Sequence, residues 1–176
     1  MTLIRVPGFF RKSMAFFLIV LAGMILAASQ LLAKEYPDFY LTDQFGNSVH
    51  SENLKGKRWV LVGCYPQDAE ICRKVGRKIY WILETLMMKK KVHIERIGYI
   101  LVHTYSEAQL QRFLPEFQKE GYESIYLDKT GELESGVKPG FAYIRAFDSQ
   151  GKKVVEEYRN SITTEEVKTL FSQILR

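Results

Sequence analysis

The sequence lacks most features that let a protein fold without a large apolar core or act through a bound metal. It has two cysteines among 176 residues, which is too few for a fold built on disulfides. It has no repeat and no low-complexity tract, which excludes a solenoid and argues against disorder. Its three histidines, His50, His93 and His103, do not stand at metal-motif spacing, so we predict neither a metal site nor a cofactor. The fold must therefore rest on burial of apolar side chains, which make up 47% of the chain.

Acidic residues are absent from the first 13 positions, which carry Arg5, Arg11 and Lys12. An unbroken apolar run follows at residues 15–28. A positive segment followed by an apolar run is the layout of a secretory signal. Because the positive flank stays inside, the rest of the chain is expected on the far side of a membrane.

Two interpretations of this segment stay open. It is cleaved as a signal peptide, at a site formed by Ala27 and Ser29 or at Ala33. Alternatively, residues 14–33 remain as a membrane anchor, since they are long enough to cross a bilayer. We therefore predict that residues 1–33 are a signal peptide or anchor helix, and that the rest of the chain is secreted or anchored in the periplasm or another extracytoplasmic compartment.

The remaining residues, 34–176, are expected to form one domain with nearly balanced charge. Without the three basic residues of the N-terminal segment, 22 basic and 20 acidic residues remain, and the two signs are interspersed. A basic stripe that would fit nucleic acid is missing, so nucleic acid is not an expected partner. We expect membrane contact only through the N-terminal segment.

The apolar pattern of residues 34–176 predicts an α/β domain. Residues 59–65 and 97–103 are nearly continuous apolar runs, which is typical of strands buried on both faces of a parallel sheet. Further strands are expected at residues 36–42, 48–50, 124–127, 141–147 and 154–158, and helices at residues 68–88, from 106 onward and 163–175. We therefore expect a central mixed sheet flanked by helices on both faces.

The expected helices have recognisable starts. Asp68 or Gln67 is a candidate cap for the first helix, and Ser106 with Gln109 forms a capping box for the second. Thr163 with Glu166 forms another before the last helix. Pro115 is expected to break or restart the second helix.

Five short strings resemble, in the same order, those of the redoxin branch of the thioredoxin-like superfamily, which includes exported thiol-disulfide oxidoreductases and peroxiredoxins. The strings are PDFYLTDQFG (residues 37–46), LKGK (54–57), WVLV (59–62), LDKTG (127–131) and FDSQGK (147–152). The resemblance runs from about Tyr36 to Ile174. It implies a thioredoxin-like fold.

The catalytic loop departs from the pattern of that superfamily. Redoxins with dithiol chemistry carry Cys-x-x-Cys at the start of the helix. With Cys72 in the inner position, the outer, nucleophilic position holds Ala69. The loop also matches the peroxiredoxin pattern only in part. In the Cys-x-x-x-Cys pattern of copper-chaperone redoxins, the position of the first cysteine holds Asp68 in this sequence. The resemblance therefore implies a degenerate active site.

A second departure concerns the cis-proline of thioredoxins, whose position falls on Ala142 when counted back from Asp148. Pro139 lies three residues earlier. It could serve through a shifted loop, but we favour an ordinary turn residue.

The candidate site residues are Cys72 and Cys64, and each also has a structural interpretation. Cys72 falls on the apolar stripe of its helix and Cys64 lies inside a buried strand, so packing in the core is favoured for both. A disulfide between them needs Cα atoms within ~7 Å and converging side chains. The sequence leaves open whether the pair is reactive, bridged or only buried.

We carry two main functional hypotheses. In the first, the chain is an exported thiol redox protein of the cell envelope that uses Cys72, with or without Cys64, on an envelope protein thiol. In the second, it is a non-catalytic redoxin-fold module that binds a partner protein, because Ala69 replaces the nucleophile. A role in copper or haem-pathway thiol handling is a third idea, by analogy alone.

Overall fold

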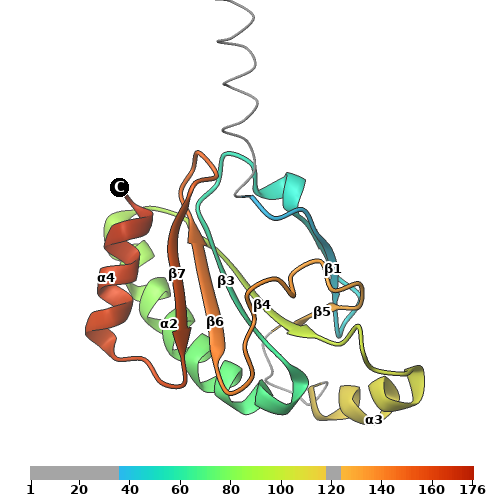
Figure 1. Ribbon diagram of the computed structural model, residues 1–176. Coiled ribbons are helices and arrows are strands. Elements are labelled where there is room, and N and C mark those ends of the chain that lie inside the picture. The colour runs from blue at the N-terminus through green and yellow to red at the C-terminus, as the bar shows by residue number, and fades with distance from the viewer. Residues whose placement is uncertain (1–35, 118–123) are drawn as a thin grey trace, which may run out of the picture. The chain divides into compact units, whose positions relative to one another are not determined.

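The computed structural model describes residues 36–117 and 124–176. In this part of the chain, seven strands form one sheet in the order β2-β1-β5-β4-β3-β6-β7 (Figure 1). β3 is parallel to β4 and β4 to β5, whereas β1, β6 and β7 pair antiparallel with their neighbours. The strands are β1 (Tyr40–Asp43), β2 (Ser48–His50), β3 (Trp59–Cys64), β4 (Glu95–Leu101), β5 (Tyr126–Asp128), β6 (Ala142–Phe147) and β7 (Lys153–Arg159). The predicted mixed sheet is confirmed.

The helices start largely where their capping residues indicate. They are α2 (Ala69–Lys90), α3 (Glu107–Phe117) and α4 (Thr164–Ile174), with short 3-10 turns η1 (Ser51–Leu54) and η2 (Pro66–Asp68). The capping box of Thr163 and Glu166 is confirmed. The expected break at Pro115 is wrong, because α3 continues through it to Phe117. A proline inside a helix removes one backbone hydrogen bond and can kink the helix without ending it.

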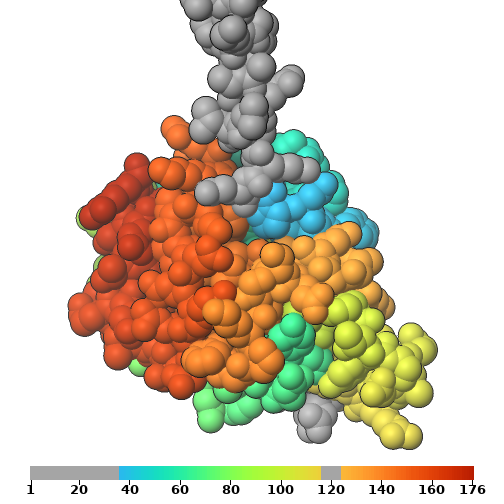
Figure 2. Space-filling view, viewed as in Figure 1, coloured from blue at the N-terminus to red at the C-terminus, as the bar shows by residue number. Residues whose placement is uncertain are grey.

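Alternate residues of the central strands face two separate apolar clusters. One cluster joins the sheet to α2 and α4 and includes Leu110 of α3. The other covers the opposite face and joins Leu54 of η1 to Leu133 and Val137, from the chain between β5 and β6. In Figure 2 the orange chain on this second side lies directly beside the blue N-terminal strands. Helical cover is therefore heavier on the α2 side of the sheet.

The predicted N-terminal signal or anchor, residues 1–33, lies outside the described residues. The described residues all belong to the compact unit Glu35–Arg176. Within them, no helix is both long and apolar enough to cross a bilayer.

Candidate functional site

The candidate site lies where β3 leaves the sheet and α2 begins. Pro66 follows directly after Tyr65 and starts the 3-10 turn η2, in which the Asp68 N–H donates to the Tyr65 carbonyl at 3.0 Å. Proline suits this place because its fixed φ matches a helical first turn and its missing N–H is not needed there. The tight turn returns the chain over the end of β3, so the first turn of α2 lies next to the last residue of that strand.

This geometry joins the two predicted site residues. Cys64, the last residue of β3, and Cys72, in the first turn of α2, form a disulfide with a Cα–Cα distance of 6.3 Å, within the usual range. Cys64 is fully buried and Cys72 is 9% exposed. The expected burial of both side chains is therefore confirmed, and the pair is also bridged, which the sequence had left open.

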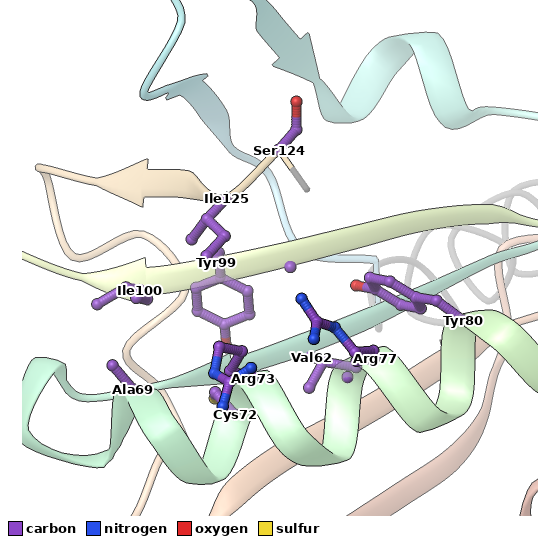
Figure 3. A pocket seen from close by; sticks show the side chains of 12 residues that line it. Val62, Ala69, Cys72, Arg73, Arg77, Tyr80, Tyr99, Ile100, Ser124 and Ile125 are labelled. Atoms are coloured by element: carbon purple, nitrogen blue, oxygen red, sulfur yellow. The ribbon is translucent and has the colours of Figure 1, made fainter. Parts of the chain in front are cut away.

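The two cysteines differ in their exposure to solvent. Cys72 lines a pocket between α2 and β4, whereas Cys64 does not (Figure 3). A thiol that attacks the disulfide must approach one sulfur along the axis of the bond, so exposure decides which sulfur reacts. Cys72 is therefore the cysteine of the pair that another molecule can reach from the pocket.

The outer position of the motif holds a residue without a reactive side chain. Ala69 is the first residue of α2 and lines the same pocket. Asp68 lies at the N-cap, but its carboxylate bonds no helix N–H. Instead it accepts a hydrogen bond from the Gly140 backbone N–H at 2.9 Å. The predicted capping role of the Asp68 side chain is therefore wrong, because this buried carboxylate ties the helix start to the loop before β6.

That loop has no cis-proline. No described peptide bond is cis, and Pro139 and Gly140 form an exposed turn, with Gly140 at φ +85°. Ala142, at the position where thioredoxins carry their cis-proline, is fully buried in β6. Pro139 is thus a turn residue, as favoured from the sequence.

A small polar cluster lies at the carboxyl ends of β3 and β4. The Tyr65 hydroxyl donates to Glu134 at 3.4 Å, and His103 Nε2 lies 3.5 Å from the same carboxylate. Burial, together with the Glu134 charge, raises the pKa of Tyr65. Among the described residues, three or more His, Cys, Asp or Glu side chains nowhere gather as potential metal ligands.

The pocket beside Cys72 was not predicted from the sequence. Its α2 wall is formed by Ala69, Cys72, Arg73, Gly76, Arg77 and Tyr80, and Val62, Ile100 and Ile125 lie opposite or beneath. About 520 Å³ of space lies between these walls, part of it open to solvent. The available signal was two glycines, Gly76 and Gly98, in the middle of a helix and of a strand, where glycine weakens regular structure.

An ion pair holds one arginine at the edge of this pocket. Arg73 donates to both oxygens of Glu70 at 2.7 Å. These hydrogen bonds from Arg73 hold the pKa of Glu70 at about 2. Glu70 is therefore ionised in any neutral medium and neutralises much of the Arg73 charge.

No protein-family model matches this chain, and no curated protein matches it significantly. Solved structures do. An exposed lipoprotein thioredoxin from Streptococcus pneumoniae matches with a TM-score of 0.56 and 16% identity, over 77% of this chain and 98% of that one. A secreted disulfide oxidoreductase from Mycobacterium tuberculosis matches with a TM-score of 0.52 and 15% identity, over 81% and 98%. Copper-bound yeast Sco1 matches with a TM-score of 0.51 and 20% identity, over 77% and 85%. The predicted thioredoxin-like fold is thereby confirmed.

Proposed function

We propose that this chain is an exported thioredoxin-fold protein that exchanges thiols and disulfides in the cell envelope through Cys72 and Cys64. The observation that carries the proposal is the disulfide between these two residues at the junction of β3 and α2. Redoxins carry their reactive cysteines at the same junction. Two of the matched structures are an exposed lipoprotein and a secreted oxidoreductase, and the N-terminal segment of this chain has the layout of an export signal.

The proposed reaction needs no group beyond the cysteine pair and a substrate disulfide. In the reduced chain, the Cys72 thiolate attacks one sulfur of the substrate, the substrate S–S bond breaks, and the other substrate sulfur leaves as a thiolate that takes a proton from water. The Cys64 thiolate then attacks Cys72 Sγ, closes the internal disulfide and releases the first substrate sulfur. Two electrons pass to the substrate, and the reverse sequence oxidises a dithiol.

The site is incomplete compared with a Cys-x-x-Cys loop. The outer position holds the half-buried Ala69, so the attacking sulfur is that of Cys72 in the inner position, and its resolving partner, Cys64, lies in the strand. A thiol in apolar surroundings has a raised pKa and is a slow nucleophile at neutral pH. We therefore expect slower exchange than in dithiol redoxins.

The second candidate is a non-catalytic module that binds a partner protein. The observation in its favour is that Cys64 is fully buried and no cysteine occupies the outer position. In this case the disulfide only strengthens the junction of β3 and α2.

Trapping of mixed disulfides separates the two candidates. In the full chain, Cys64→Ala removes the resolving sulfur and should accumulate a mixed disulfide on Cys72 with a model disulfide peptide. Cys72→Ala should accumulate none, and the wild type should reduce insulin in the presence of a thiol reductant. If the folded wild type leaves insulin intact and Cys64→Ala traps nothing, the redox proposal is wrong and the binding module remains.

Export is tested independently. Residues 1–33 fused to a phosphatase that is active only outside the cytosol should give activity, and the same phosphatase without them should give none. An inactive fusion that is nevertheless expressed would contradict the proposed location.

A further inference from the structure

We infer that the pocket beside Cys72 binds a small apolar carboxylate, with the acid group at Arg77 and Arg73 and the apolar body between α2 and β4. The inference does not require thiol exchange. It rests on the shape, the lining and the charge of the pocket.

Two glycines create the space. Gly98 lies in the middle of β4, and a Cβ there would lie 3.3 Å from the Tyr80 hydroxyl. Gly76 lies on the facing side of α2, and a Cβ there would meet only Val62, at 3.8 Å. Larger side chains at these positions would project into the gap between helix and strand. The missing side chain at Gly76 therefore leaves room for a ligand, whereas at Gly98 it leaves room for the Tyr80 hydroxyl at the edge of the pocket.

The walls of the pocket are apolar. The lining is mainly apolar and includes Val62, Ala69, Ile100 and Ile125, together with Cys72. Apolar surface of a ligand that enters gains about 25 cal/mol for each Å² removed from water. The body of the ligand should therefore be hydrocarbon or aromatic.

The charge is supplied by one side of the helix. Arg73, Arg77 and Tyr80 recur at helical spacing, and their side chains extend from α2 toward β4 (Figure 3). None of the described residues that line the pocket is acidic. Arg73 is already bound to Glu70, whereas Arg77 forms no ion pair or hydrogen bond with any described residue.

These observations point to one negative charge on the ligand. The guanidinium of Arg77 offers a planar pair of donors that matches a carboxylate. Arg73, one turn earlier on the helix, adds to the positive potential. A carboxylate on an apolar body satisfies both the charged edge and the apolar walls.

The test compares 2-naphthoate with 2-naphthamide, which has the same body without the charge. Binding to the full chain in lipid nanodiscs is measured by titration calorimetry, with empty nanodiscs subtracted. We expect saturable binding of 2-naphthoate and at least tenfold weaker binding of 2-naphthamide, since a charge-assisted hydrogen bond contributes roughly tenfold or more. Lack of saturable 2-naphthoate binding, or equal affinity for the two compounds, overturns the inference.

Variants locate the site. Arg77→Gln should weaken 2-naphthoate about tenfold and leave 2-naphthamide nearly unchanged. Lys74→Gln is the matched control, because it removes an equally charged side chain from the same helix outside the pocket, and it should change neither affinity. Gly98→Val should block both compounds, and circular dichroism checks its folding. If Lys74→Gln weakens 2-naphthoate as much as Arg77→Gln does, binding is non-specific and the inference fails.

Loss of thiol exchange would not remove this binding. The single variant Cys64→Ala, which changes no residue that lines the pocket, should still bind 2-naphthoate, although it cannot complete the thiol-exchange cycle. Failure of the ligand inference and failure of the proposed function are therefore distinguishable.

Discussion

On the α2 side, the sheet is covered mainly by aliphatic side chains, whereas the opposite side is covered largely by aromatic rings. The aliphatic side packs Val60, Val62 and Ile144 under α2 and α4, and it holds both the disulfide and the pocket. On the aromatic side, Trp59 and Phe147 stack with ring centroids 4.0 Å apart. The two faces of one sheet thus serve different purposes: the aliphatic face carries the candidate site, and the aromatic face supports it.

Glycines show the difference most clearly. In β3, the space above Gly63 is filled by the ring of Tyr99, since a Cβ on Gly63 would lie 2.0 Å from that ring. On the other side, a Cβ on Gly76 would meet only Val62, at 3.8 Å, and Gly76 and Gly98 both line the pocket. The same residue type therefore allows close packing on the aromatic face and a cavity on the aliphatic one.

The aromatic face also buries a cation. The Arg145 side chain lies 4.8 Å from the centre of the Tyr143 ring and donates to the Tyr99 hydroxyl at 2.9 Å. The Tyr99 hydroxyl in turn donates to the Leu133 carbonyl at 3.3 Å. These contacts join β4, β6 and the chain between β5 and β6, so this network fixes the loop that ends at Gly140 beside the candidate site.

The largest effect on stability is expected from the substitution Gly63→Ala. Its Cβ would collide with the ring of Tyr99, which is buried and hydrogen-bonded to Arg145 and Leu133, so we expect a loss of about 3 kcal/mol or more in the free energy of unfolding. Urea denaturation followed by circular dichroism measures it. A loss below 1 kcal/mol would show that the aromatic face repacks easily, which contradicts the comparison.

A second prediction concerns alkaline pH. Burial raises the pKa of Tyr99 to about 12, against the opposing charge of Arg145, from an ordinary value of 10.0. The neutral phenol is therefore favoured in the folded state. Its contribution is complete below pH 10 and is lost as the pH rises from 10 toward 12, by up to about 3 kcal/mol.

The measurement is denaturation at a series of pH values from 9 to 12. Other tyrosines, including Tyr36 and Tyr143, also have a raised pKa, so the wild type will lose stability through several groups. Tyr99→Phe should lose less stability over this range than the wild type does. Equal pH dependence of the two proteins would show that Tyr99 titrates normally.

On the aliphatic side, removal of the disulfide should lower the free energy of unfolding somewhat less than the changes on the aromatic side do. The cysteines are separated by eight positions in the sequence, for which the chain-entropy model gives about 2.5 kcal/mol. Reduction of the wild type with a phosphine should lower the free energy of unfolding by this amount. The double variant Cys64→Ala/Cys72→Ala should be insensitive to the phosphine. If reduction leaves the free energy of unfolding of the wild type unchanged, the disulfide does not stabilise the fold, and only a redox role would remain for it.

The smallest effect, with the opposite sign, is expected from Gly76→Ala. Alanine is favoured over glycine inside a helix by about 0.5–1 kcal/mol, and the new Cβ would make only an ordinary contact with Val62 at 3.8 Å. The variant should therefore be more stable than the wild type in the same urea assay. A destabilised Gly76→Ala protein would mean that the aliphatic face is as tightly packed as the aromatic one.

Much of the fold could be predicted from local pattern. The strands around residues 59–65 and 141–147 and the last helix lie within one or two residues of their expected bounds, because burial on one or both faces imposes a period on the sequence. The errors concern single side chains. Asp68 has the right type and place for a helix cap, yet it bonds Gly140, 72 positions away.

The candidate site was predictable only in part. Cys72 and Cys64 could be named, since a redoxin-like order of strings placed them near the junction of strand and helix. Their bond depends on how far the turn at Pro66 carries α2 back over β3, which a spacing of eight positions does not state. The pocket could not be anticipated, since Arg77 and Ile125 meet only across the packed helix and sheet.

By itself, the sequence determined which segments are strands and helices, which of their faces are apolar and which two residues could carry thiol chemistry. These properties depend on neighbours a few positions apart, and such neighbours leave a periodic trace. Tertiary structure alone decided that the two sulfurs are joined, that Tyr99 fills the space above one glycine and that two other glycines line a pocket. Those outcomes depend on contacts between segments far apart in the chain, and such contacts are set by how closely the helix and the strands pack.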